Sequence, residues 1–246
     1  MSHYLVGVIT KNKPEYEELC DILSPFDESI EVEPYVAHTY EQVKETFEDI
    51  LKKHDHQTPN KNRARFRALK KALATDDIEG IQSFNAWYHY YEDIDSAGNA
   101  LSTYNPQSKW DWWHVGGRWG DTFEDDSVQL KELKRFPVED YSLKELKKKF
   151  PEYYRDYKKL LKDGHIFKPE YYLERYPTFE KYVSAKMDFV PFAFVDVEGE
   201  WHEPGQMGWF GVDTSTEESI EKYDEEYWNV VESHPDYYMT IIDCHI

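Results

Sequence analysis

The sequence predicts an α+β fold: a single domain over residues 1–246, with an antiparallel or mixed sheet and a helical insertion over about residues 131–186. Short apolar runs rich in β-branched residues, HYLVGVIT and MTIIDCHI, lie at the two ends and are typical of interior strands. Much of the chain between them carries apolar residues at helical spacing. Because both terminal runs belong inside a sheet, we expect them to close one domain rather than two in tandem.

The first half contains a strand, an irregular stretch and three helices. Residues 3–10 form the strand, which the turn-prone KNKP ends. Residues 24–36, SPFDESIEVEPYV, are acidic, contain two prolines and are predicted to be irregular. A capping-box pattern beginning at Thr39 starts a helix. Residues 63–74 and 77–92 are predicted to form two further helices.

The second half alternates between strands and helices. An aromatic strand is expected to reach Val115, where two glycines break it. Ser142 begins a helix that Pro151 should kink or divide. The remaining expected elements are one or two short helices over 168–184, a hairpin formed by 191–196 and 200–202, a helix over 217–231 and a last strand over 239–246.

Composition and charge exclude several classes of function and indicate a cellular location. The net charge of −20 excludes general binding to nucleic-acid backbones and docking on anionic membranes. No apolar run reaches the roughly 18 residues that a membrane span needs, and the first residues lack the pattern of a signal peptide. Cys20 and Cys244 are the two cysteines, which suits free thiols in a reducing compartment. We therefore expect a cytoplasmic protein.

The segment KWDWWHVGGRWGD, residues 109–121, is the strongest candidate site. Alternation in a strand places two sets of side chains on opposite faces: Trp110, Trp112 and His114 on one, and Asp111, Trp113 and Val115 on the other. Gly116 and Gly117 permit positive φ and expose N–H donors to an anion. Arg118 offers a planar fork to phosphate or carboxylate, and Trp119 a surface for stacking on a flat ring. The alternative is that the tryptophans fill the core while Arg118 pairs with a neighbouring aspartate.

Two further segments carry candidate residues. In GEWHEPGQMGWFG, residues 199–211, Trp209 is a candidate wall of a binding pocket, and His202 and Glu203 are candidate acid–base groups or ligands. A hairpin followed by a packed loop explains the same segment equally well. In the terminal DCHI, Asp243 and His245 share a face and Cys244 points the other way. A structural end strand is the favoured explanation there.

A metal site is a second possibility for these residues. The candidate ligands of a divalent metal ion are His202, Asp243 and His245. A three-ligand site forms only if His114 or His202 lies close to the strand face that carries Asp243 and His245. Cys244 is a candidate nucleophile only if a histidine lies beside it. The HExxH, paired CxxC and GxSxG patterns are absent from the sequence. The histidines of the HDH segment at 54–56 are expected to lie in a surface loop.

Several of these stretches together resemble a known group of proteins. They are the N-terminal strand, LSPFDE at 23–28, YNPQSKWDWWHVGGRW at 104–119, PFAFVDVEGEWHEPGQMGWFG at 191–211, and the terminal DCHI. On these stretches the chain resembles a group of uncharacterised proteins encoded by bacteriophages and some bacteria. The resemblance implies a phage–host setting, and therefore the host cytoplasm, but it brings no activity and no catalytic residues. Residues 40–100 and 131–186 carry no matching motif.

Three classes of function follow from the sequence, and whether the protein is an enzyme stays open. The leading hypothesis is binding of a small anionic, nucleotide-derived ligand, with Arg118 and glycine amides on the anion and tryptophans on the ring. Such a protein would act against host defence by sequestering an immune second messenger. The second is a hydrolase of such a nucleotide, metal-assisted or not, with His114, His202, Asp243 and His245 as candidate catalytic residues. The third is an acidic inhibitor that occupies a basic host protein or mimics nucleic acid.

Overall fold

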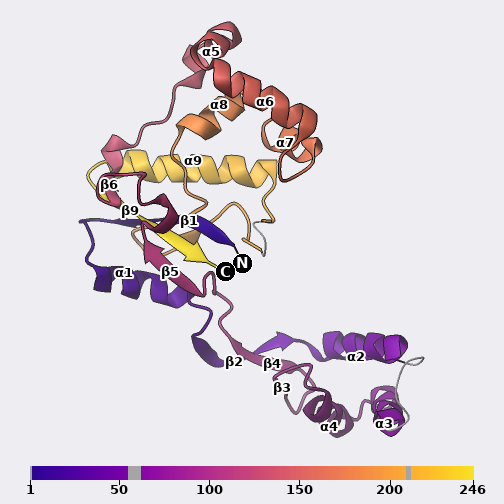
Figure 1. The fold of residues 1–246 in the computed structure, drawn as a ribbon. Helices are drawn as coiled ribbons and strands as arrows, with labels where there is room; N and C mark the ends of the chain where they lie inside the picture. The colour runs from indigo at the N-terminus through magenta and orange to yellow at the C-terminus, as the bar shows by residue number, and fades with distance from the viewer. Residues whose placement is uncertain (1, 55–61, 209–211) are drawn as a thin grey trace. The chain divides into compact units, whose positions relative to one another are not determined.

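A computed structural model describes residues 2–54, 62–208 and 212–246 and confirms the α+β fold class (Figure 1). The chain forms two compact units. The larger unit comprises Met1–Asp27 and Gln107–Ile246, and the smaller unit comprises Glu28–Pro106. Each unit has hydrophobic clusters of its own.

The larger unit is built on a mixed sheet with the strand order β5-β9-β1-β7-β8, in which β6 also pairs with β9. Its strands are β1 (His3–Thr10), β5 (Trp112–Val115), β6 (Ser127–Gln129), β7 (Ala193–Val195), β8 (Trp201–His202) and β9 (Tyr238–His245). β1 is antiparallel to β9 along its whole length and parallel to β7. The two apolar runs at the ends of the sequence lie inside one sheet, as predicted, and the structure shows in addition that they are neighbours there.

Two helices cover opposite faces of this sheet (Figure 1). Helix α1 (Tyr16–Leu23) packs Leu19 and Leu23 against the β1 residues Val6 and Val8. Helix α9 (Glu217–Ser233) packs its aromatic residues against Met239 of β9 on the other face. Alternation along β9 thus sends Cys244 to the α1 face, and Asp243 and His245 to the α9 face.

A helical segment follows β6 within the larger unit, over α5 (Leu143–Lys149), α6 (Pro151–Asp163), α7 (Pro169–Arg175) and α8 (Phe179–Met187). The predicted capping box at Ser142 is present, and Pro151 occupies the first turn of α6, so it divides the two helices. Leu146, Tyr157 and Phe179 belong to a separate, largely aromatic cluster. Short 3-10 turns elsewhere in the larger unit are η1 (Ser24–Phe26), η3 (Gly117–Trp119), η4 (Leu130–Glu132) and η5 (Val138–Asp140).

The smaller unit combines a three-stranded sheet, in the order β2-β4-β3, with three helices. Its elements are β2 (Glu31–His38), α2 (Tyr40–His54), α3 (Arg63–Ala74), α4 (Ile78–Tyr88), β3 (Asp93–Ile94) and β4 (Ala100–Tyr104). Phe47, Leu69, Ile81 and Phe84 belong to its core.

Two sequence predictions need correction in this unit, and one pair of strands was not predicted. Part of the stretch predicted to be irregular is strand β2, which accepts Pro34 because β2 lies at the sheet edge. The pair β3 and β4 was not predicted, since both strands are short and turn-forming residues follow each of them. The helix expected over 77–92 ends at Tyr88, because His89 takes a left-handed conformation with φ of 55°.

Candidate functional site

The candidate site lies along the sheet edge formed by β5 and β6. Both strands run antiparallel to β9, β5 opposite its last residues and β6 opposite its first. They therefore behave as one edge strand that residues 116–126 interrupt. The GGRWGD part of the aromatic motif, residues 116–121, forms the first part of this interruption, and its Gly117 lies against Asp243 of β9.

The glycines are needed because the interrupting turn lies directly against Asp243. Gly116 and Gly117 both have positive φ, 67° and 51°, as the sequence suggested. A Cβ on Gly117 would lie 2.5 Å from Asp243 Oδ2, which only glycine avoids. This close approach allows the Arg118 backbone N–H to donate to Asp243 Oδ2 at 3.1 Å. The anion that this turn binds is thus a carboxylate of the protein itself.

Two backbone donors of this turn are bound within the protein, whereas the expectation that the Gly117 N–H reaches a ligand stays a prediction. The Gly116 N–H donates to the Ile241 carbonyl at 2.9 Å, and the Arg118 N–H is held by Asp243. Arg118 is exposed, and its side chain has no hydrogen bond or ion pair with the described residues. The Arg118 side chain, but not its backbone N–H, is therefore available to bind an anion.

Two histidine–aspartate pairs lie side by side next to this turn. His3 Nδ1 is 2.8 Å from Asp243 Oδ1, and His245 Nδ1 is 2.6 Å from Asp111 Oδ1. Asp243 and His245 are buried, with 3% and 5% of their surfaces exposed. The register places His3 directly opposite His245, since β1 pairs with β9 at these residues. Residues from both ends and the middle of the sequence thus meet here.

Trp112 completes this group, which we call the paired-histidine cluster: His3, Asp111, Trp112, Asp243 and His245. The two imidazole centroids are 4.9 Å apart and nearly perpendicular. Trp112 stacks on His245 at 5.0 Å with a 17° angle, and it meets His3 edge-on at 5.2 Å. Since 44% of Trp112 is exposed, the cluster presents one indole ring to solvent.

The hydrogen bonds determine which ring nitrogens are available. An ionised carboxylate only accepts hydrogen bonds, so each Nδ1 that contacts one carries the hydrogen. In the neutral form of each ring the lone pair is then on Nε2, and neither Nε2 has a partner among the described residues. Asp243 is itself held on both oxygens, by His3 and by the Arg118 N–H. Such a ring can accept a proton at Nε2 when it is neutral and can deliver one from Nε2 when it is protonated.

The other aromatic residues of the motif lie elsewhere. Trp110 is buried in the core on the α1 face, and Trp113 packs beside it with Tyr16 at 5.3 Å. Alternation predicted Trp110 on the face of Trp112, which is wrong because the strand begins only at Trp112 and Trp110 pairs with Asp27 instead. Trp119 is half-buried in η3. Trp209 lies outside the described residues.

Two further candidates behave differently. His114 is on the predicted face, opposite Asp243, but it is exposed and its Nδ1 contacts the neighbouring Val115 carbonyl at 2.6 Å. Cys244 is fully buried in the apolar core on the other face, and burial raises the pKa of its thiol well above the usual value. Cys244 is therefore placed as a core residue rather than as a nucleophile.

A shallow hollow of about 400 Å³ adjoins the cluster. Its lining comes from α1, η1 and the start of the motif: Tyr16, Cys20, Ser24, Asp27, Trp110, Asp111, Trp112 and Trp113. Asp111 and Trp112 belong to both the hollow and the cluster. A ligand that rests in the hollow can therefore touch the carboxylate that holds His245.

His202 is separated from the cluster by the width of the sheet. It lies on β8, and β7 and β1 stand between β8 and β9. The candidate metal site of His202 with Asp243 and His245 is therefore not formed. His202 instead stacks on Phe194 at 4.5 Å, with Nε2 3.0 Å from Asp196 and Nδ1 3.0 Å from Glu226. Within the described ranges, Asp196, Glu200 and His202 are the one group whose ligand atoms lie close enough for a metal ion.

Glu203, the other candidate in that segment, accepts hydrogen bonds from Lys109 Nζ at 2.7 Å and from the Trp201 indole at 2.9 Å. This half-buried ion pair connects the start of the aromatic motif to the end of β8. Glu203 therefore has a structural role in joining two motif segments.

His3 and Asp111 are the site residues that sequence reasoning missed. The available signal was period-two alternation: His3 begins an otherwise apolar strand, and DCHI places two polar groups on one face of its partner strand. No protein-family model, no curated protein and no solved structure matches the chain. Over the part of the chain that the structure describes, no helix is long and apolar enough to span a membrane.

Proposed function

We propose that this protein hydrolyses a phosphoester bond in a small, anionic, nucleotide-like substrate, using His3 and His245 as its acid–base pair. The observation that carries the proposal is the pair of imidazoles, 4.9 Å apart, each with its Nδ1 on a separate carboxylate. A structural strand pair does not require two such dyads side by side. Two histidines that differ in protonation form a common device for general acid–base catalysis.

The chemistry assigns one role to each ring. The Nε2 of one histidine takes a proton from water as the water oxygen forms a bond to phosphorus. The Nε2 of the other histidine, protonated, gives its proton to the oxygen whose bond to phosphorus breaks. Asp243 and Asp111 orient the rings and stabilise the imidazolium that forms on each. His3 and His245 are thus the catalytic residues, and the two aspartates are positioning residues.

Recognition of the substrate is assigned to Trp112 and Arg118. The exposed Trp112 ring offers a stacking face for a base. The exposed Arg118 guanidinium suits a phosphate. Because the Arg118 backbone, and not its side chain, holds Asp243, an Arg118→Ala variant removes the anion contact and keeps the turn. It should weaken substrate binding while the protein stays folded.

The test is incubation of the full chain with linear and cyclic nucleotides and ADP-ribose derivatives, followed by mass spectrometry. We expect at least one compound to be hydrolysed: a cyclic substrate gains the mass of water, and a linear substrate gives two products whose masses sum to its own mass plus that of water. His3→Asn and His245→Asn should each lower the turnover rate by about 10²–10⁴, the usual effect of losing a general acid or base. His114→Asn is the matched control, since His114 is exposed and outside the pair. Equal turnover by all three variants would refute the assignment.

Sequestration without chemistry is the second candidate, favoured by the exposed Trp112 ring and Arg118 side chain. It predicts that a compound raises the melting temperature and is recovered unchanged after heat denaturation. In that case Arg118→Ala should abolish the shift, whereas His3→Asn should leave it largely intact. If no compound shifts the melting temperature or changes mass, the results favour the third class of function, in which the acidic surface binds a protein partner.

A further inference from the structure

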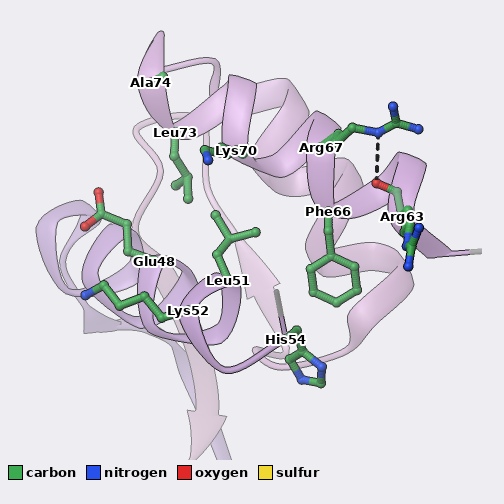
Figure 2. A pocket seen from close by; sticks show the side chains of 10 residues that line it. All are labelled: Glu48, Leu51, Lys52, His54, Arg63, Phe66, Arg67, Lys70, Leu73 and Ala74. Carbon is green, nitrogen blue, oxygen red and sulfur yellow. Dashed lines mark hydrogen bonds between the residues drawn. The ribbon is translucent and has the colours of Figure 1, made fainter. Parts of the chain in front are cut away.

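A groove of about 830 Å³ lies between α2 and α3 of the smaller unit (Figure 2). We call it the α2–α3 groove, and its lining residues are Glu48, Leu51, Lys52 and His54 of α2 and Arg63, Phe66, Arg67, Lys70, Leu73 and Ala74 of α3. It belongs to a different unit from the paired-histidine cluster. The acid–base chemistry proposed above makes no use of it.

The α3 residues in this lining form one continuous face of the helix. Their spacing is that of i, i+3, i+4, i+7, i+10 and i+11, which brings side chains to the same side of an α-helix. At 1.5 Å per residue, this stripe from Arg63 to Ala74 extends for about 17 Å, roughly three turns. The groove is thus elongated along α3 rather than confined to one position on the helix.

Cations are distributed along the whole stripe. Arg63, Arg67 and Lys70 are all exposed, and none has a carboxylate partner among the described residues. The helix α3, RARFRALKKALA, contains no acidic residue, although the chain as a whole carries a net charge of −20. Of the α2 residues in the lining, Glu48 is the one acid, and Lys52 pairs with Asp49 at 2.8 Å.

Apolar side chains lie between these cations. Figure 2 shows Leu51 from α2, and Phe66 and Leu73 from α3, pointing into the space between the two helices. Leu73 is part of the core, whereas Leu51 and Phe66 are half-buried. Arg67 lies at the rim, where its Nε contacts the Arg63 carbonyl at 3.4 Å. The surface therefore alternates apolar and cationic groups at helical spacing.

This pattern selects among the possible anions. A fatty acid has one charged head, which leaves most of a 17 Å row of cations unmatched. A nucleic acid spreads its charge suitably, but Leu51 and Leu73 do not stack on bases, and the net charge of −20 repels a long phosphate backbone. A helix that carries acids beside an apolar stripe matches both the charge and the spacing.

We propose that the α2–α3 groove binds an acidic amphipathic helix of about three turns, supplied by a partner protein. Leucine-type side chains of that helix pack on Leu51, Phe66 and Leu73. Its carboxylates face Arg63, Arg67 and Lys70.

The probe is a fluorescein-labelled helical peptide of about four turns, with leucines on one face and glutamates flanking them. Its binding to the full chain is measured by fluorescence anisotropy, beside a scrambled peptide of the same composition. We expect saturable binding of the amphipathic peptide that weakens as salt is added. R67E and K70E should each weaken the affinity at least about tenfold, equivalent to 1.4 kcal/mol.

The matched control is K71E, which reverses an exposed charge on the same helix outside the groove lining. It should change the affinity less than about threefold, as expected for a charge outside the interface. All three positions are exposed, and an unchanged helical circular-dichroism signal will confirm that the variants fold. A labelled oligothymidine, measured in the same way, tests a nucleic acid as the occupant. Equal binding of the scrambled peptide, an equal effect of K71E, absence of saturable binding, or tighter binding of the oligothymidine would each overturn the proposal.

Discussion

Gly117→Ala is the substitution that most directly tests how the interrupting turn and Asp243 depend on each other. Gly117 has a φ of 51°, and an added Cβ would lie 2.5 Å from Asp243 Oδ2. The turn must therefore move away from β9. That movement stretches the hydrogen bond from the Arg118 N–H to Asp243 and disturbs the contact of Asp243 with His3.

Two contributions set the magnitude. The left-handed conformation costs a non-glycine residue about 1–2 kcal/mol. Loss of a hydrogen bond to the buried Asp243 carboxylate, of which 3% is exposed, costs about 1.5–3 kcal/mol. Together they predict that Gly117→Ala lowers the free energy of unfolding by about 2.5–5 kcal/mol, which is a large share of the stability of a typical domain.

Gly199→Ala separates the two contributions. Gly199 also has a positive φ, 81°, but an added Cβ there meets no atom within 4 Å. This variant should lose only the conformational part, about 1–2 kcal/mol. Urea denaturation of both variants, followed by fluorescence of the many tryptophans, measures the difference. Equal losses for the two variants would show that the turn does not press on Asp243, and the reasoning would be refuted.

The remaining predictions concern protons. Native protein treated with a thiol reagent at pH 8 should react at the half-buried Cys20 and not at Cys244, whose thiol pKa is raised by burial; modification of Cys244 without denaturant would contradict this placement. Burial also raises the pKa of Asp224, so folding favours its protonated form and stability falls as pH rises from the ordinary value of 3.8 through the raised folded value. Asp224→Asn should therefore be more stable than the natural chain at neutral pH and equal to it below pH 3.8, as measured by melting temperature; a less stable variant at neutral pH would refute this.

Local patterns in the sequence were sufficient to predict many of the individual strands and helices. Short apolar runs rich in β-branched residues identified β1 and β9 as interior strands, and the structure pairs them along their whole length. The signals at Ser142 and Pro151 correctly placed a helix start and a helix division. These signals work because caps, prolines and side-chain periodicity act over a few residues. The same local rule failed at Trp110, where a pairing with Asp27 ends the alternation.

The candidate site depends on residue pairings that such local rules cannot predict. Alternation alone placed Asp243 and His245 on a common face, and the glycine pair indicated a turn with positive φ. The partners of these residues depend on contacts across 240 positions for His3 with Asp243, and across 134 positions for His245 with Asp111. The strand register chooses those partners. It is set by the packing of whole strands and helices, so it has no local signature.

The sequence by itself therefore determined the fold class, the terminal strands and the presence of a concentrated aromatic and glycine motif. Only the tertiary structure showed that His3 lies opposite His245 and that the Arg118 N–H donates to Asp243. It alone placed His202 at the far side of the sheet. The physical reason is that a residue's own neighbours decide its conformation and its face, whereas the order and register of strands decide which distant residue it meets.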